Sequence, residues 1–214
     1  SMASMFSGAN VFNQNIGSWN VSKVTAMNAM FQTATAFNNG GSNTIQSWSA
    51  PLCTTFSGMF NLASTFNHPL TNLVNTSGVD GCSMASMFSG ANVFNQNIGS
   101  WNVSKATAMN AMFFQATSFN NGGSNTIQSW SAPLCTLFIN MFLTASAFNQ
   151  PLTNLVNTSG VVSCQLNSMF QTATQFNKNI GSWDVSKASN MSSMFQGATS
   201  FNNGGSNTIQ NWSA

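Results

Sequence analysis

A long internal repeat, which relates residues 1–82 to residues 83–164, constrains this chain more than any other feature of its sequence. The six tryptophans form two series with that spacing, Trp19, Trp101 and Trp183 and then Trp48, Trp130 and Trp212. Met-Phe pairs divide the repeat into three turns of 25–29 residues, which start at Met5, Met30, Met59, Met87, Met112, Met141, Met169 and Met194. Regular periods of this length are typical of stacked units, none of which can bury its apolar side alone.

The apolar positions inside one turn indicate the type of stack. Residues 16–24 carry apolar side chains in the order apolar-x-x-apolar-x-apolar-x-x-apolar, which matches the leucine-rich-repeat frame. The short alternation at residues 19–21 predicts the strand. Between residues 24 and 34 the apolar spacing changes to three and four, which predicts a short helix. We therefore expect an α/β solenoid of leucine-rich-repeat type, with eight stacked turns, a parallel β ladder on one face and short helices or loops opposite.

The repeats define one domain over residues 1–214, with superrepeats at 1–82 and 83–164 and an incomplete one at 165–214. The first four residues, SMAS, recur in phase at 83–86, and the sequence stops inside a turn. We expect these residues to be a window of a longer solenoid, with its signal, anchors and caps outside the window.

Two kinds of insertion recur every third turn. An NNGGSNT segment lengthens the turns that start at Met30, Met112 and Met194, and its composition predicts a loop. The turns that start at Met59 and Met141 instead gain three residues after the expected strand. We expect both insertions to decorate one edge of the stack. An asparagine also follows the second phenylalanine of each turn, and we expect its amide to form an internal ladder between turns.

The charge content excludes some partners. Only 3% of the residues are charged and the net charge is +2, whereas an average soluble domain has roughly 25% charged residues. Lys23, Lys105 and Lys187 occupy the same position of successive superrepeats, and arginine is absent. A nucleic-acid partner is therefore not expected, because phosphate binding requires clustered cations. No run reaches the ~18 apolar residues that a membrane span needs. Self-association or a neutral partner, in an extracellular or surface setting, fits this composition better.

The repeated run MF-x-x-A-x-x-FN-x-x-I-x-x-W-[ND]-VS resembles the BspA-like leucine-rich-repeat surface proteins. Residues 169–191, MFQTATQFNKNIGSWDVSKASNM, are the closest match in the chain. The resemblance implies a leucine-rich-repeat-like solenoid that is displayed outside the cell and used for adhesion or surface structure. It implies no catalysis and supplies no functional residues.

Four cysteines form two pairs with the same spacing, Cys53 with Cys82 and Cys135 with Cys164. Because this spacing is about one turn and adjacent strands lie ~4.8 Å apart, we predict the inter-turn disulfides Cys53–Cys82 and Cys135–Cys164. The alternative is buried free thiols, since Cys53 takes the apolar slot of Val24.

Neither a metal site nor a catalytic centre is expected. The cysteines lack Cys-x-x-Cys spacing, and the single histidine, His68, is replaced by Gln150 in the next superrepeat. Asp80 and Asp184 do not occupy equivalent positions, so the repeat does not pair them for acid–base chemistry. We expect no enzyme activity and no cofactor.

Surface modification and binding have their own candidate residues. Asn-x-Ser/Thr sequences predict possible glycosylation at Asn75 and Asn157 in the inserted loop, and at Asn20 and Asn102 on the expected strand. The outward positions of that strand are candidate contacts, unless this face is only solvated: Ser18, Asn20, Ser22, Ser100, Asn102 and Ser104.

Three functions are compatible with these features. The leading hypothesis is a structural repeat segment of an extracellular or surface fibre or adhesin, a rigid rod that associates with itself. The second is a module that recognises a glycan or a neutral protein on the strand face. The third is ice binding, which regular Thr, Ser and Asn ladders on an uncharged rod suggest.

Overall fold

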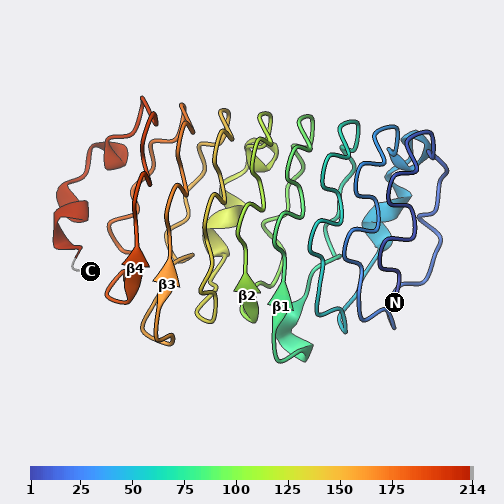
Figure 1. Cartoon of the computed structure of the whole chain (residues 1–214), viewed down its shortest axis with the longest axis horizontal. Coiled ribbons are helices and arrows are strands. Elements are labelled where there is room, and N and C mark those ends of the chain that lie inside the picture. Colours follow the sequence, from blue (N-terminus) through green and yellow to red (C-terminus); the bar gives the residue numbers. More distant parts are fainter. Residues whose placement is uncertain (213–214) are drawn as a thin grey trace.

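The turns of this protein lie side by side along one axis, as a repeat solenoid requires. The computed structural model describes residues 1–212. The chain winds from the N-terminus at one end of the stack to the C-terminus at the other (Figure 1). The tandem repeat predicted from the sequence is therefore confirmed.

Regular secondary structure is sparse. Two pairs of short parallel strands are present, β1 (Cys82–Ser83) with β2 (Ala106–Ala108) and β3 (Cys164–Gln165) with β4 (Ala188–Asn190). The helices are all 3-10 helices: η1 (Asn39–Gly41), η2 (Asn43–Ser47), η3 (Thr76–Gly78), η4 (Asn121–Gly123), η5 (Asn125–Ser129), η6 (Asn203–Gly205) and η7 (Asn207–Asn211). Within residues 1–212 there is no α-helix. The short helix expected after each strand is therefore a wrong prediction.

Consecutive β-turns replace the expected helix around each Met-Phe pair. In the second turn the N–H groups of Met30 and Gln32 donate to carbonyls three residues earlier in the chain. The N–H groups of Ala29 and Phe31, which alternate with these along the chain, instead donate to the next turn, to Ser57 O and Met59 O, both at 2.8 Å. An α-helix needs every N–H for bonds to residue i−4, so these two sets of bonds exclude it.

Two residues in each turn also have a left-handed backbone, which interrupts a helix. One precedes the methionine of the Met-Phe pair and the other follows it by three residues. The first set is Ser4, Ala29, Gly58, Ser86, Ala111, Asn140, Ser168 and Ser193, and the second is Gly8, Thr33, Leu62, Gly90, Gln115, Thr144, Thr172 and Gly197.

The parallel pairing also lies elsewhere than predicted. It runs through the residue four positions before each methionine, from Ala26 through Thr55 and Ser83 to Ala108, Leu137 and Gln165. At the expected strand position the isolated bridges are Asn75 with Asn102 and Asn157 with Asp184. The insertions explain the difference. They fall between the second phenylalanine and the ladder, so neighbouring turns differ in length there, whereas the segment around Met-Phe has one length throughout.

Stacked phenylalanines form the centre of the core. Within one turn the rings of Phe31 and Phe37 lie 3.9 Å apart, and between turns Phe31 and Phe60 lie 5.4 Å apart. Equivalent pairs continue along the chain and are separated by distances at which aromatic rings attract each other. Four tryptophans are buried with them, Trp48, Trp101, Trp130 and Trp183, whereas Trp19 in the first turn is 37% exposed because no turn covers it.

The predicted asparagine ladder is present. In every turn but the last, the asparagine that follows the second phenylalanine accepts a bond at its side-chain oxygen from the backbone N–H of the equivalent residue in the next turn. The bond from Asn38 N to Asn13 Oδ1 is 2.8 Å long, and the series continues through Asn67, Asn95, Asn120, Asn149 and Asn177 to Asn202. These amides satisfy backbone donors where the turns lack strand pairing.

We expect Phe113→Ala to destabilise the protein by about 3–5 kcal/mol, because it opens a cavity between two stacked neighbours. Phe6→Ala is the matched control, since Phe6 is half-buried and has a stacked neighbouring turn on only one side. Urea unfolding of both variants checks this expectation. A loss for Phe113→Ala no larger than that for Phe6→Ala would contradict the role assigned to the stack.

Candidate functional site

The NNGGSNT insertions fold back onto the preceding turn. In the second superrepeat Asn121 is fully buried, and its Oδ1 accepts a 2.9 Å bond from the backbone N–H of Ile98. Its Nδ2 donates to Ser124 O and Thr126 Oγ1, at 2.7 and 3.2 Å. Asn39 and Asn203 make the same bonds in the other superrepeats. The expected loop is therefore an ordered element whose second asparagine belongs to the interior.

The helix that follows each insertion forms a ridge on the side of the rod. In η5 the hydroxyl of Thr126 donates to Asn97 Oδ1 at 2.8 Å, and that of Ser129 donates to Gly99 O at 3.1 Å. A Cβ on Gly99 would collide with Oγ1 of Thr126. Glycine is needed at this position because the ridge approaches the backbone so closely. Gly17 and Gly181 face Thr44 and Thr208 in the same way.

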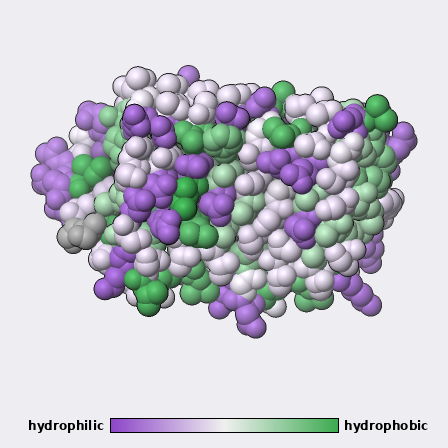
Figure 2. Space-filling model, viewed as in Figure 1, coloured by the Kyte–Doolittle hydropathy of each residue, from purple (hydrophilic) through white to green (hydrophobic). Residues whose placement is uncertain are grey.

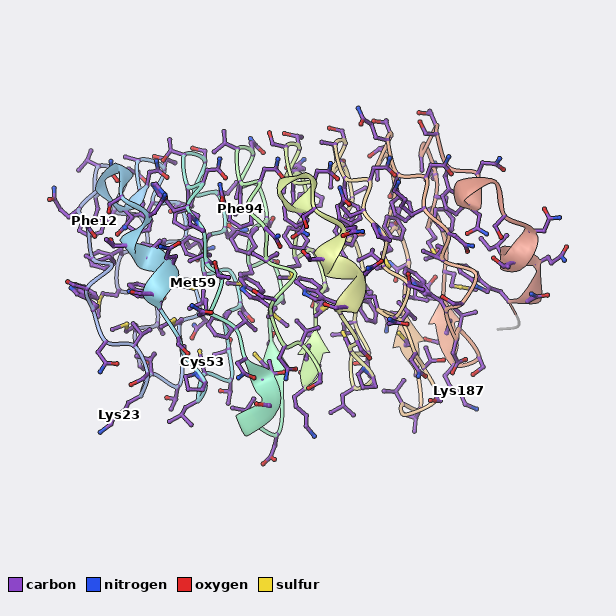
Figure 3. The ribbon with its side chains drawn as sticks, turned by 180° about the vertical axis from the view of Figure 1, so that it is seen from behind. Phe12, Lys23, Cys53, Met59, Phe94 and Lys187 are labelled. Carbon is purple, nitrogen blue, oxygen red and sulfur yellow. The ribbon has the colours of Figure 1, made fainter. Side chains whose placement is uncertain are left out.

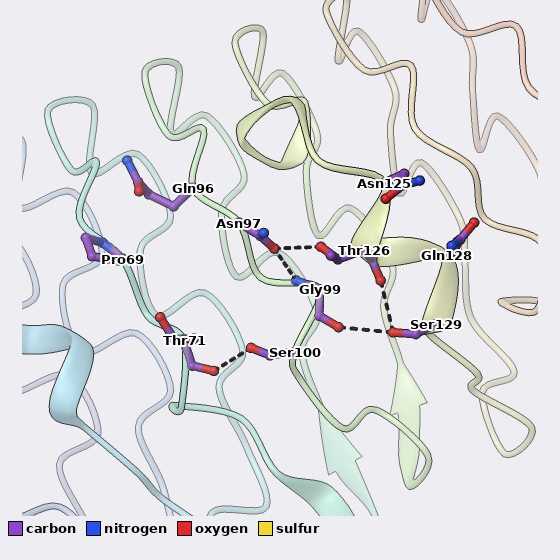
Figure 4. Close-up of a pocket in the computed structure, with 10 residues that line it drawn as sticks. All are labelled: Pro69, Thr71, Gln96, Asn97, Gly99, Ser100, Asn125, Thr126, Gln128 and Ser129. Carbon is purple, nitrogen blue, oxygen red and sulfur yellow. Dashed lines mark hydrogen bonds between the residues drawn. The ribbon is translucent and has the colours of Figure 1, made fainter.

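A hollow of 580 Å³ lies beside this ridge (Figure 4). Its lining comes from three successive turns and carries no charged side chain: Pro69, Thr71, Gln96, Asn97, Gly99, Ser100, Asn125, Thr126, Gln128 and Ser129. Two of these turns, which start at Met59 and Met87, lack the NNGGSNT insertion, and the third carries the ridge.

Four other hollows adjoin or repeat this one. An equivalent hollow of 460 Å³ lies one superrepeat earlier and includes Ser18, Gln46 and Ser47. A third, of 410 Å³, shares Ser47 with that hollow and shares Thr71 and Ser100 with the largest. Two more, of 270 and 280 Å³, occur near the C-terminal end and share Ser182 and Asp184. We call these five hollows together the axial groove.

The predicted strand-face residues divide between the axial groove and its surroundings. Ser18, Ser100 and Asn102 line it. Asn20, Ser22 and Ser104 line none of the five hollows; Asn20 Oδ1 accepts from Ser22 N and Asn102 Oδ1 accepts from Ser104 N, both at 3.0 Å. Sequence reasoning missed the residues of the ridges, such as Gln46 and Gln128. The TIQ motif, which follows the insertion in every superrepeat, was the signal that could have found them.

One carboxylate is the sole charged residue in the lining of the axial groove. Asp184 Oδ1 accepts a 2.9 Å bond from the backbone N–H of Ser186, and this bond, followed by one from the Ser186 side chain, lowers the pKa of the carboxyl. Figure 2 shows one face of the molecule as mostly pale, with scattered polar and apolar residues. Within the described part of the chain no group of His, Cys, Asp or Glu side chains could hold a metal ion.

The two predicted disulfides are not formed. All four cysteines are free and buried, although each pair lies in neighbouring turns as expected. The thiols of Cys53 and Cys135 donate to carbonyls in their own turns, Thr55 O at 3.2 Å and Leu137 O at 3.6 Å. Sγ of Cys164 lies 3.8 Å from the backbone oxygen of Cys135. The alternative prediction of buried thiols therefore describes this structure. Figure 3 shows Cys53 among the side chains of the stack.

The candidate glycosylation sites are accessible. Asn75 and Asn157 are exposed, and each accepts a bond from a backbone N–H two residues later, at 3.2 and 3.1 Å. Asn20 and Asn102 are exposed as well. Modification at these four positions stays a prediction.

The family described as "Mycoplasma protein of unknown function, DUF285" matches the chain at residues 1–83, 39–154 and 123–214. These three overlapping matches extend over the whole sequence, in agreement with its repeats. No curated protein and no solved structure matches the chain. Among the described residues no helix is both long enough and apolar enough to cross a membrane.

We expect the four thiols to react slowly with iodoacetamide at pH 8 in the folded protein and rapidly after unfolding without a reductant. Burial raises the pKa of Cys82 from 9.0 to about 12, and the neighbouring Cys53 adds to the effect. Burial also raises the pKa of Cys164 to about 11. Little thiolate, the reactive form, is then present. Mass spectrometry counts the additions; fewer than four after unfolding would indicate bridges.

The same pKa values predict a loss of stability in alkali. Above pH 9 the unfolded thiols release protons while the folded thiols keep theirs, so the free energy of unfolding falls as pH rises toward about 12. Urea unfolding at pH 8 and pH 10.5 measures the fall. Cys82→Ala should show a smaller fall than the unmodified protein, and an equal fall would assign the alkaline effect to other groups.

Proposed function

Because the chain belongs to the DUF285 family, whose function is unknown, we propose its function from the stacking of its turns. We propose that it is a structural repeat segment of a rigid, self-associating rod, which further turns or further copies extend at its ends. The observation that carries the proposal is the direction of the backbone bonds between turns.

Around each Met-Phe pair, the backbone N–H groups that bond to another turn all donate in one direction. Four of them in each turn donate to four carbonyls of the next turn toward the C-terminus, and this pattern recurs at every junction. Bonds that run the other way, such as Thr54 N to Thr25 O at 3.0 Å, lie outside this segment. The stack therefore has a donor end and an acceptor end. At the first junction the donors are Met2, Ser4, Phe6 and Gly8, and the acceptors are Ala26, Asn28, Met30 and Gln32, at 2.8–2.9 Å.

The two end turns present complementary groups. In the last turn the equivalent donors make no backbone bond within the described residues: Met191, Ser193, Phe195 and Gly197. In the first turn the carbonyls of Ser1, Ala3, Met5 and Ser7 likewise accept no backbone bond there. Such edges are templates for pairing with a further turn, whether that turn belongs to the same chain or to another copy.

The side chains of the two ends match as well. Phe195 and Phe201 are half-buried in the last turn, and Phe6 and Phe12 are half-buried in the first. Each ring pair is stacked within its turn, at 3.9 and 4.0 Å, and has a covered face and an open one. The bonds of the asparagine ladder run in the opposite direction, toward the N-terminus. The side-chain oxygen of Asn202 is therefore the next acceptor at the donor end, and the backbone N–H of Asn13 is the next donor at the acceptor end. A second copy can therefore continue all three ladders.

Contact between unlike ends is heterologous, and repetition of such a contact gives an open filament unless a rotation closes it. The low charge supports association, because it provides little repulsion between copies. The resemblance of the repeated MF…W[ND]VS run to BspA-like surface proteins supports an extracellular or surface location, as a fibre or as the shaft of an adhesin.

Two charge variants test the end-to-end contact. Phe6→Glu should block the acceptor end, and Phe201→Glu should block the donor end, because a carboxylate is not tolerated between stacked rings. We expect the unmodified chain to form species that grow with concentration, whereas each variant alone stays monomeric in sedimentation experiments. An equimolar mixture of the variants retains one intact junction and should form a dimer and nothing larger.

Circular dichroism and thermal unfolding of each variant serve as the control for folding. Folded variants that assemble like the unmodified chain would show that copies meet along their sides, which would overturn the proposal. So would an unmodified chain that stays monomeric at millimolar concentration.

A further inference from the structure

We propose that the axial groove is a binding site for a linear, uncharged polysaccharide that lies parallel to the rod. This inference goes beyond the structural role, because it concerns the side of the stack and not its ends. The sequence led us to expect a neutral partner on the strand face. The inference specifies where that partner binds and to which class of ligand it belongs.

The shape of the groove fits an extended ligand. The hollows of 460, 410 and 580 Å³ adjoin at Ser47, Thr71 and Ser100, so they follow one another from the first turn to the fifth. The two hollows near the C-terminal end adjoin at Ser182 and Asp184. A small ligand needs only one such hollow. A series of adjacent hollows along one axis accommodates a chain of similar units.

The chemistry of the lining fits a carbohydrate. Hydroxyl and carboxamide groups predominate, and each of these can both donate and accept hydrogen bonds, as sugar hydroxyls do. Pro69, Val74 and Gly99 add small apolar surfaces for the C–H faces of sugar rings. An anionic polymer would lose hydration without meeting a cation, because no lysine lines any of the five hollows. The ligand should therefore be neutral.

The groove is arranged before any ligand arrives. Ser100 Oγ donates to Thr71 O at 2.8 Å, Ser129 Oγ donates to Gly99 O at 3.1 Å, and Thr126 Oγ1 donates to Asn97 Oδ1 at 2.8 Å. The Thr126 hydroxyl also accepts from Asn121 Nδ2 and therefore only holds the ridge in place. The hydroxyl oxygens of Ser100 and Ser129 accept no bond from the described residues, so their lone pairs stay able to accept from a ligand. By contrast, the exposed side chains of Gln46 and Gln128 make no hydrogen bond with the described residues, so they remain available as donors and acceptors. A preformed site avoids part of the entropic cost of binding.

The repeat of the groove adds avidity. Equivalent hollows recur every three turns, a rise of about 14 Å at ~4.8 Å per turn. A polymer that occupies one hollow is held near the next, which raises its effective concentration there. Affinity should therefore increase with polymer length until the ligand spans the groove.

Affinity electrophoresis and calorimetry with the full chain test the proposal. The neutral probes are length series of β-1,4-glucan, α-1,4-glucan, mannan and chitin oligosaccharides, and the charged comparators are heparin and polylysine. Ser100→Trp and Ser182→Trp fill the groove at its junctions. Ser118→Trp is the matched control, because Ser118 is exposed and lines none of the hollows.

We expect at least one neutral series to bind with a dissociation constant that falls as length increases. The double variant Ser100→Trp/Ser182→Trp should bind at least tenfold more weakly, and Ser118→Trp should bind as the unmodified chain does. Absence of binding to every neutral series would overturn the proposal, and so would preference for a charged polymer or equal affinity in the filled variant. Phe6→Glu and Phe201→Glu should retain binding, so this result is independent of end-to-end assembly.

Discussion

The backbone bonds between successive Met-Phe segments are the interaction on which the rest of this structure depends. Because alternate N–H groups donate to the next turn, each turn can stack without long strands or helices. The phenylalanine rings and the asparagine amides then repeat at the same spacing, since they belong to the same segment of each turn. The backbone bonds between turns therefore account for the phenylalanine core, the asparagine ladder and the direction of the stack.

That arrangement also explains where variation is tolerated. The segment from the β-paired residue to the second phenylalanine has the same length in all turns. Every insertion lies in the rest of the turn, after the second phenylalanine. The NNGGSNT insertions build ridges at η2, η5 and η7, and the turns between them leave the hollows. The axial groove is thus a consequence of unequal turns on a uniform core. Its polar lining, which is uncharged except at Asp184, can change without disturbing the stacked rings.

The sequence was sufficient to predict the repeat and the asparagine ladder, because both depend on side chains that recur in register. It did not predict the β-turns, since apolar spacings of three and four around Met30 fit a helix equally well. The positive φ at residues such as Ala29 and Thr33 is incompatible with a helix, and neither residue type signals it. The axial groove could not be predicted from the sequence either, because its depth depends on how closely η5 packs against Gly99. Three of the predicted contacts, Ser18, Ser100 and Asn102, nevertheless line it.

Hydrogen exchange of the dilute protein tests the directional ladder most directly. We expect strong protection at the N–H groups of Phe31, Phe60, Phe88 and Phe113, which donate between turns. We expect rapid exchange at Ser193, Phe195 and Gly197, which occupy equivalent positions in the last turn, and their protection should rise as the concentration increases. Equal protection of these two sets of N–H groups in the dilute protein would contradict the directional ladder. So would the continuous protection that is typical of a helix, if it followed the β-paired residue of each turn.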